Sequence, residues 1–203
     1  TKRSCAKIVR VSLLALFVAS IAVLGAEVKP FKWSGELNVP DPTSVTFDEA
    51  GNAYVASTTR RKAGDLDIRE HRLWIPDDVG LTSPAEKLAF LQRELAPGKM
   101  KAGRGSLKDH NKDGSVDWKD LTFHQERIYK LADTDRDGVA DKITVFAEGF
   151  NSPVSGIAAG VLYFDGWVYL TAIPDVWRLK DTDGDVVADV KEVIATGFGG
   201  HIA

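Results

Sequence analysis

The sequence predicts a mainly β protein built from a repeated unit of short strands. Two segments align without a gap, one beginning at Ile128 and the other 48 positions later at Val176, and each runs from an apolar strand pattern through an acidic turn to a closing Gly-Phe. Between them, aromatic and β-branched residues flank Asp165-Gly166, a pair that favours a two-residue hairpin turn. An earlier hairpin pattern occupies residues 44–57. One period therefore carries about four strands.

A period of this length with four strands is typical of one blade of a β-propeller. After the first 26 residues the chain has room for about three to four such periods, so the predicted fold is a partial β-propeller. We expect residues 27–203 to form the N-terminal part of a longer propeller domain. A β-sandwich with a duplicated hairpin is the alternative that the repeat leaves open.

Residues 1–26 have the features of a signal peptide. Basic residues without any acidic residue precede an apolar run from Val11 to Gly25, and small residues follow, so cleavage is expected near Gly25 or Ala26. The protein is thus predicted to be secreted or periplasmic. An uncleaved anchor, which would associate the protein with a membrane, is the alternative, although the run is shorter than the about 20 residues of a spanning helix.

The composition outside this segment excludes several kinds of site. Cys5, the only cysteine, lies within the segment, so disulfides, zinc-thiolate sites and a CxxCH haem attachment are excluded from the rest of the sequence. Without residues 1–26, the chain keeps 22 basic against 29 acidic residues. This acidic balance argues against nucleic acid as a partner and favours cations.

Residues 59–122 interrupt the repeat and are predicted as an insertion. Within it a helix is expected over residues 84–95, because Ser83 is a good N-cap, Pro84 suits the first helical position and a capping box follows. Residues 60–80 are dense in charge and lack a clear period, so they are predicted as a long surface loop.

Three acidic turns match the twelve-residue calcium loop of EF-hand proteins, in which oxygen ligands stand at alternate positions and glycine at position 6 permits a sharp turn. The first turn, residues 109–120, lies in the insertion and has aspartate at position 12, where glutamate is usual. Its predicted ligands are Asp109, Asn111, Asp113, Ser115, Asp117 and Asp120.

The other two turns stand at the same place in the two repeats. The predicted ligands of the second turn are Asp133, Asp135, Asp137, Val139 through its carbonyl, and Asp141. Those of the third turn are Asp181, Asp183, Asp185, Val187 through its carbonyl, Asp189 and Glu192. The third turn has Val186 at position 6, and valine is poorly suited to the left-handed conformation that glycine adopts there. It is therefore predicted to be the weakest of the three sites.

A single acidic turn of this kind can be a polar turn in which aspartates cap their own backbone. Three copies, two of them in register with a strand repeat, favour bound calcium, because carboxylates within a few ångströms repel one another without a cation. No helix pair is predicted around the second and third turns. The ions are therefore expected to be structural and to fasten two strands of one blade.

Histidine supplies the candidate for acid–base chemistry. His201 follows the Gly-Phe of the second repeat, on a connection that would face the central channel of a propeller, and it is the candidate catalytic residue. A structural histidine is the alternative. His71, His110 and His124 are expected at the surface. The sequence has no GxSxG, Walker, dinucleotide-binding or HExxH motif, so these residues alone establish no enzyme.

Four segments carry a resemblance to a known family: residues 59–83, 105–122, 126–151 and 197–203. Over about residues 36–203 the chain resembles the N-terminal domain of membrane-bound dehydrogenases common in planctomycetes. That family is similar to sorbosone and soluble glucose dehydrogenases, which are β-propellers that use pyrroloquinoline quinone (PQQ).

The resemblance implies an exported, calcium-containing quinoprotein that oxidises a sugar or alcohol and passes electrons to a cytochrome c, either its own C-terminal domain or a separate protein. In such chemistry a histidine base takes the hydroxyl proton while hydride moves to the quinone. The match at residues 197–203 assigns that role to His201. A non-catalytic calcium-dependent carbohydrate-binding or adhesion module is the alternative from another class.

Overall fold

The structure is a computed structural model that describes residues 29–60, 66–100 and 107–199. The predicted signal segment, Cys5 and His201 lie outside the described residues. Residues Trp33–Ala203 form one compact unit, which holds all the helices and strands described below.

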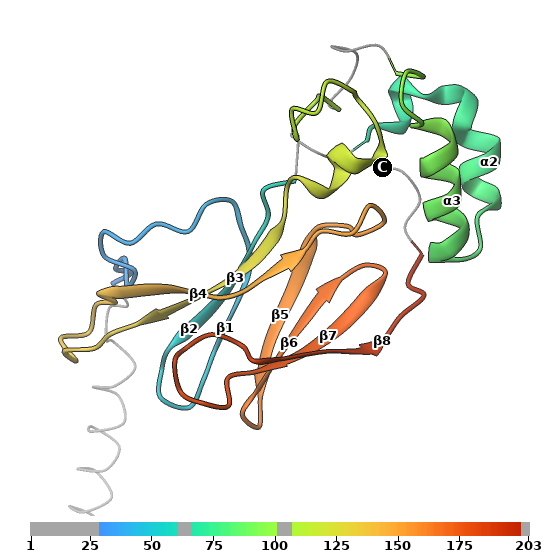
Figure 1. The fold of residues 1–203 in the computed structure, drawn as a ribbon. Coiled ribbons are helices and arrows are strands. Elements are labelled where there is room, and N and C mark those ends of the chain that lie inside the picture. The colour runs from blue at the N-terminus through green and yellow to red at the C-terminus, as the bar shows by residue number, and fades with distance from the viewer. Residues whose placement is uncertain (1–28, 61–65, 101–106, 200–203) are drawn as a thin grey trace, which may run out of the picture. The chain divides into compact units, whose positions relative to one another are not determined.

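Eight strands form two four-stranded antiparallel sheets (Figure 1). In both sheets each strand pairs with the next one along the chain, so each sheet is a simple meander. Sheet A consists of β1 (Pro42–Phe47), β2 (Ala53–Ser57), β3 (Glu126–Ala132) and β4 (Lys142–Phe150). Sheet B consists of β5 (Ala158–Phe164), β6 (Trp167–Ala172), β7 (Asp175–Lys180) and β8 (Val190–Ala195). The prediction of a mainly β protein is confirmed.

The two sheets have the same internal pairing. Val55 pairs with Tyr129 in sheet A, and Leu170 pairs with Trp177, 48 positions after Tyr129, in sheet B. The hairpin turn predicted at Asp165-Gly166 joins β5 to β6. The described residues hold two such sheets, whereas the sequence predicted chain enough for three to four, because the insertion between β2 and β3 takes up much of the length.

The main core lies between the two sheets. It forms because alternate residues of a strand point to the same face, so that on β6 Val168, Leu170 and Ala172 are buried while the residues between them are not. The buried members of this core are Tyr54, Ala56, Ile128, Phe146, Ala147, Phe150, Ala158, Val168, Leu170, Ala172, Leu179 and Ala188. Each large apolar side chain buried here contributes about 1.5–3 kcal/mol.

A buried carboxylate joins the two sheets where β3 and β5 begin. Glu126, at the start of β3, accepts hydrogen bonds from the Thr58 hydroxyl (2.8 Å) and from the amide of Ala158 (2.7 Å), the first residue of β5. The Thr43 hydroxyl of β1 donates to the Ala158 carbonyl at 2.5 Å. These bonds fix β1 and β5 side by side, which sets how the sheets pack.

The insertion contains more helix than the sequence predicted. The expected helix is present as α3 (Pro84–Glu94), with the Ser83 hydroxyl accepting from the Glu86 amide at 3.2 Å. The prediction of a long surface loop over residues 60–80 is wrong for residues 68–80, which form the 3₁₀ helices η1 (Ile68–Glu70) and η2 (Arg72–Trp74) and the helix α2 (Ile75–Gly80).

These short helices form because they share a second core with α3. The Trp74 ring meets the Phe90 ring edge-on at 5.6 Å, and the buried members of the core are Phe90, Leu91, Leu95, Leu107, Val116 and Leu121. Turns this short leave no hydrophobic period in the sequence. Among the described residues, none of the helices has the length and apolar character needed to cross a membrane.

Candidate metal centres

Two of the predicted acidic loops lie at the same end of the strands. Loop 2 (residues 133–141) joins β3 to β4, and loop 3 (residues 181–189) joins β7 to β8. The tight β1–β2 and β5–β6 turns lie at this same end of the strands, whereas the insertion follows β2 at the opposite end (Figure 1). The candidate cation sites at the sheets are therefore far along the strands from the insertion.

Loop 2 winds its backbone around the carboxylate at position 1. Asp133 accepts hydrogen bonds from the amides of Arg136 (2.7 Å), Asp137 (3.2 Å) and Gly138 (2.9 Å). Asp135 accepts from the Asp137 amide, and Asp137 accepts from the Val139 amide. One oxygen each from Asp133, Asp135 and Asp137 lies within 4.8 Å of the others. Calcium binds oxygen at 2.3–2.6 Å, so two of its ligands lie at most about 5 Å apart. The three carboxylates therefore fit a shared calcium ion.

Asp141, at position 9, closes loop 2. Its two carboxylate oxygens accept from the Thr134 amide (3.0 Å) and the Thr134 hydroxyl (2.6 Å). These bonds, the hydroxyl first and then the amide, lower the pKa of the Asp141 carboxyl. The residue thus ties the two ends of the loop together, a task beyond the ligand role that the sequence predicted.

Loop 3 repeats this arrangement. Asp181 accepts from the amides of Gly184 (2.7 Å) and Val186 (2.9 Å), and Asp189 accepts from the amide and hydroxyl of Thr182. Those two bonds, the amide first, lower the pKa of Asp189. Asp183 accepts from the Asp185 amide and Asp185 from the Val187 amide. Oxygens of Asp181, Asp183 and Asp185 again lie within 4.8 Å of one another.

The backbone of loop 3 requires left-handed residues at two positions. Val186, at position 6, has φ 79°, and Gly184, at position 4, has φ 86°. Loop 2 also has positive φ at both positions, with Arg136 at 62° and Gly138 at 93°. The sequence pattern indicated the need at position 6 and missed the need at position 4, where loop 3 has its glycine.

Glu192, predicted as the position-12 ligand of loop 3, lies instead in strand β8. It pairs across the sheet with Arg178, whose guanidinium contacts the Glu192 carboxylate at 2.5 Å. It is not among the clustered carboxylates of loop 3. Strand pairing and a cation on the neighbouring strand account for this position.

Loop 1 (residues 109–120) has the same first half and a different closure. Asp109 accepts from the amides of Asp113 (3.2 Å) and Gly114 (3.1 Å), and Asn111 accepts from the Asp113 amide. The Ser115 hydroxyl and amide donate to Asp113 and lower the pKa of that carboxyl. The first half of loop 1 therefore has turn hydrogen bonds like those of loops 2 and 3, but among the described residues only loops 2 and 3 bring three carboxylates within 4.8 Å of one another.

The predicted ligands at positions 9 and 12 of loop 1 serve the backbone. Asp120 is fully buried and accepts from the amides of His110 (2.8 Å), Asn111 (3.2 Å) and Asp117 (2.9 Å). Asp117 is 1% exposed and caps the 3₁₀ helix η3 (Trp118–Thr122). Buried carboxylates that hold several backbone amides stabilise a loop whether or not an ion is bound.

Position 8 of each loop is a buried apolar residue, a feature that the sequence pattern did not predict. Val116 in loop 1, Ala140 in loop 2 and Ala188 in loop 3 are 5%, 3% and 5% exposed. Val116 belongs to the core of the insertion, and Ala188 belongs to the core between the sheets. The loops are therefore packing elements as well as candidate cation sites.

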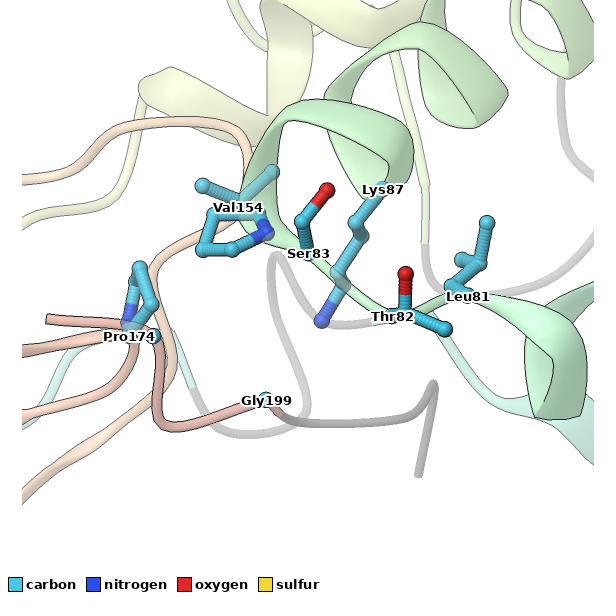
Figure 2. A pocket seen from close by; sticks show the side chains of 9 residues that line it. Leu81, Thr82, Ser83, Lys87, Val154, Pro174 and Gly199 are labelled. Carbon is cyan, nitrogen blue, oxygen red and sulfur yellow. The ribbon is translucent and has the colours of Figure 1, made fainter.

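A small cavity lies at the end of the strands away from loops 2 and 3, between the insertion and sheet B (Figure 2). Its volume is about 150 Å³, and its walls include Ser83 and Lys87 of α3 with its N-cap, Val154, Pro174 and the glycines of the chain after β8. The first turn of α3 is capped from within, because Glu86 accepts from the amide and hydroxyl of Thr82. Pockets for cofactor-sized ligands are about 300–1,000 Å³, so this cavity alone is too small for one.

A protein-family model matches residues 27–201 and is described as a domain of unknown function, DUF7133. The chain belongs to the DUF7133 family. Neither the curated proteins nor the solved structures contain a match to it.

The histidines described in this DUF7133 chain lie in the insertion or at its end. The His71 ring stacks on Trp74 at 4.0 Å, and burial lowers the pKa of His71. His110 stacks on Phe123 at 5.3 Å and meets His124 edge-on at 4.7 Å. These rings contribute packing, and His201, the candidate base, lies beyond the described residues of the DUF7133 domain.

Proposed function

We propose that this DUF7133 chain is a calcium-binding part of an exported β-propeller of the quinone-dependent dehydrogenase type. The observation that supports it most is the repeat of a four-stranded meander, whose last two strands recur after 48 residues and carry an acidic loop with the same pattern of hydrogen bonds in each copy. In this proposal each sheet is one blade. Calcium at loops 2 and 3 is structural in this proposal, because both loops lie at the end of the strands away from the insertion and the cavity beside it.

The proposed reaction is oxidation of a sugar or alcohol, with electrons passing to a cytochrome c. The quinone cofactor, PQQ, would supply the hydride acceptor. His201 would take the hydroxyl proton of the substrate, the role that the family resemblance implies. Gly197 and Gly199, which precede that histidine in the sequence, line the cavity beside sheet B.

Thermal unfolding in calcium tests the metal part of the proposal. Residues 27–203 should melt at a higher temperature as calcium is added, because a ligand that binds only the folded state stabilises it. Asp135→Asn should reduce the rise, since it removes a clustered carboxylate of loop 2. Asp165→Asn is the matched control: it removes the same charge from a hairpin turn, at φ 49°, which asparagine tolerates. An unchanged melting temperature in calcium would remove the calcium proposal.

Reconstitution tests the redox part. A chain loaded with PQQ and calcium should reduce a dye in the presence of aldoses or alcohols, and His201→Asn should lower the rate by about 100-fold or more. Absence of both PQQ binding and dye reduction would contradict the dehydrogenase proposal.

The size of the cavity favours a second candidate function. Among the described residues the space between the insertion and sheet B is about 150 Å³, less than a cofactor needs. A non-catalytic, calcium-dependent carbohydrate-binding or adhesion module would need no such pocket. Glycan binding that requires calcium, without PQQ binding, would support this candidate.

A further inference from the structure

Among the described residues, one face of sheet B is exposed, and the 48-residue repeat shows which face of sheet A it corresponds to. Phe146 and Phe150 of sheet A are 2% and 3% exposed beneath sheet B. Their counterparts 48 positions later, Ile194 and Phe198, are 48% and 52% exposed. Sheet B thus covers the face of sheet A that carries Phe146 and Phe150. Among the described residues, the equivalent face of sheet B, which carries Ile194 and Phe198, is exposed to solvent.

Other residues extend this open face across the sheet. On β5, Leu162 and Phe164 are 56% and 64% exposed, and Leu162 lies opposite Tyr169 in the pairing of β5 with β6. Tyr169 is the counterpart of Tyr54, which is 4% exposed in the core between the sheets. Contiguous exposed apolar surface of this kind is typical of an interaction site.

A backbone hydrogen bond fixes the register of the existing contact between the sheets. The Ala188 amide, at position 8 of loop 3, donates to the carbonyl of Phe146 at 2.8 Å. Phe146 lies at a β-bulge of β4, between the residues paired with Ile128 and Tyr129, and a bulged residue is left out of the ladder. Ile194 lies at the equivalent bulge of β8. Sheet B thus offers the same acceptor position as sheet A.

The other end of the chain shows the same contact already made. The Ala140 amide, at position 8 of loop 2, donates to the carbonyl of Trp33 at 2.8 Å. Trp33, Leu37 and Val39 pack on this outer face of sheet A. A second copy of the chain could stack head to tail on sheet B only by displacing its own Trp33 from this place. The repeat therefore disfavours a second copy as the occupant of the open face.

We propose that the open face of sheet B, centred on Tyr169 and Ile194, docks a further four-stranded antiparallel sheet of the same repeat. The occupant presents small and aliphatic residues equivalent to those of sheet B that meet sheet A: Val168, Leu170, Leu179 and Ala188. It also carries an acidic loop whose position-8 amide donates to the Ile194 carbonyl. The acidic loops act as clips between successive sheets, and this role rests on the proposed arrangement of the sheets as blades.

An extended chain tests this directly. Residues 151–199 are added again directly after Phe198, so that a second copy of sheet B follows the first at the natural spacing. Amide hydrogen exchange of Val193–Ala195 should slow by about 10-fold or more relative to the unextended chain, because docking protects the edge around the bulge. Binding of the dye ANS, which reports exposed apolar surface, should fall. In the extended chain Ile194→Lys should abolish both effects.

The matched control is Val193→Lys in the extended chain. Val193 pairs with Trp177, which packs toward sheet A, so it lies on the other side of β8 and its replacement should leave docking intact. Unchanged exchange at Val193–Ala195 in the extended chain would overturn the proposal, whether or not the added residues fold. Protection of Ile194 in a dimer of the unextended chain would also overturn it, because the occupant would then be a second copy. Neither readout depends on quinone, so docking without PQQ binding would count against the dehydrogenase proposal alone.

Discussion

Loops 2 and 3 have the same backbone but carry glycine at different positions. Loop 2 has Arg136 and Gly138 at positions 4 and 6, with φ of 62° and 93°. Loop 3 has Gly184 and Val186 at those positions, with φ of 86° and 79°. An L-residue in the left-handed region costs about 1–2 kcal/mol, and glycine avoids that cost. Each loop therefore has one relaxed and one strained left-handed residue, which the comparison of position 6 alone would have missed.

The largest effect on calcium binding and stability is expected from removing the position-1 carboxylate of one loop. Asp133→Ala removes a clustered oxygen and the acceptor of three backbone amides, so it should abolish the calcium site that we propose in loop 2. A site filled at 100 times its Kd contributes about 2.7 kcal/mol. Calorimetric titration should then show one site fewer and thermal unfolding a smaller rise in calcium. Asp181→Ala should have the same effect through loop 3, and a titration unchanged by both would contradict the assignment.

Placing valine at position 6 of loop 2 should give the next largest effect. Gly138→Val creates a loop with unfavourable residues at both left-handed positions, because Arg136 stays at position 4. We expect a loss of about 2 kcal/mol in the free energy of unfolding, measured by urea denaturation in calcium-free buffer. No neighbouring atom lies within 4 Å of a Cβ at this position, so Gly138→Ala separates the backbone term from side-chain bulk. Equal stability of Gly138→Val and the unchanged chain would mean that the loop is not held in this conformation.

The reverse change should stabilise loop 3 by a smaller amount. Val186→Gly removes about 1–2 kcal/mol of strain but increases the freedom of the unfolded chain, which offsets about 0.5–1 kcal/mol. The net gain of about 1 kcal/mol should appear in urea denaturation, together with tighter calcium binding. Val187→Gly, next to it at ordinary φ, is the control and should destabilise. A loss of stability in Val186→Gly would show that the valine side chain contributes more by packing than its backbone costs.

The sequence predicted those features that depend on neighbouring residues and missed those that depend on contacts between distant ones. The hairpin at Asp165-Gly166 and helix α3 could be predicted because their turn and capping residues are local. The burial of Ala140 and Ala188 could not, because it depends on Trp33 and Phe146, which lie far away in the sequence. Contacts of this kind leave no local pattern.

A different, local ambiguity applies to the aspartates of loop 1. Asp120 has the residue type and spacing of a calcium ligand, yet it is buried and accepts three backbone amides. A carboxylate at position 12 can either bind an ion or close the loop, and spacing alone does not distinguish these roles. In loops 2 and 3 the closing role belongs to position 9, where Thr134 and Thr182 supply the donors. A threonine at position 2 is the sequence signal that could have separated the two kinds of loop.

The smallest effect is expected when the pH is lowered. It tests the hydrogen bonds with which Asp141 and Asp189 close loops 2 and 3. Hydrogen bonds from threonine lower the pKa of Asp141 and Asp189, so each bond favours the charged carboxylate in the folded state. The stability they contribute is present above the unfolded pKa, near 4, and is lost as the pH falls through the lower folded value. In calcium-free buffer, Thr134→Val should raise the pKa of Asp141, measured by NMR, and should shift the acid end of the stability curve toward higher pH. Asp189 should keep its low value in that variant, and Thr182→Val should reverse the pattern. If Thr134→Val left the Asp141 pKa unchanged, the carboxylate would owe its lowered pKa to its own backbone amide and to Lys142, and not to the closure of the loop by Thr134.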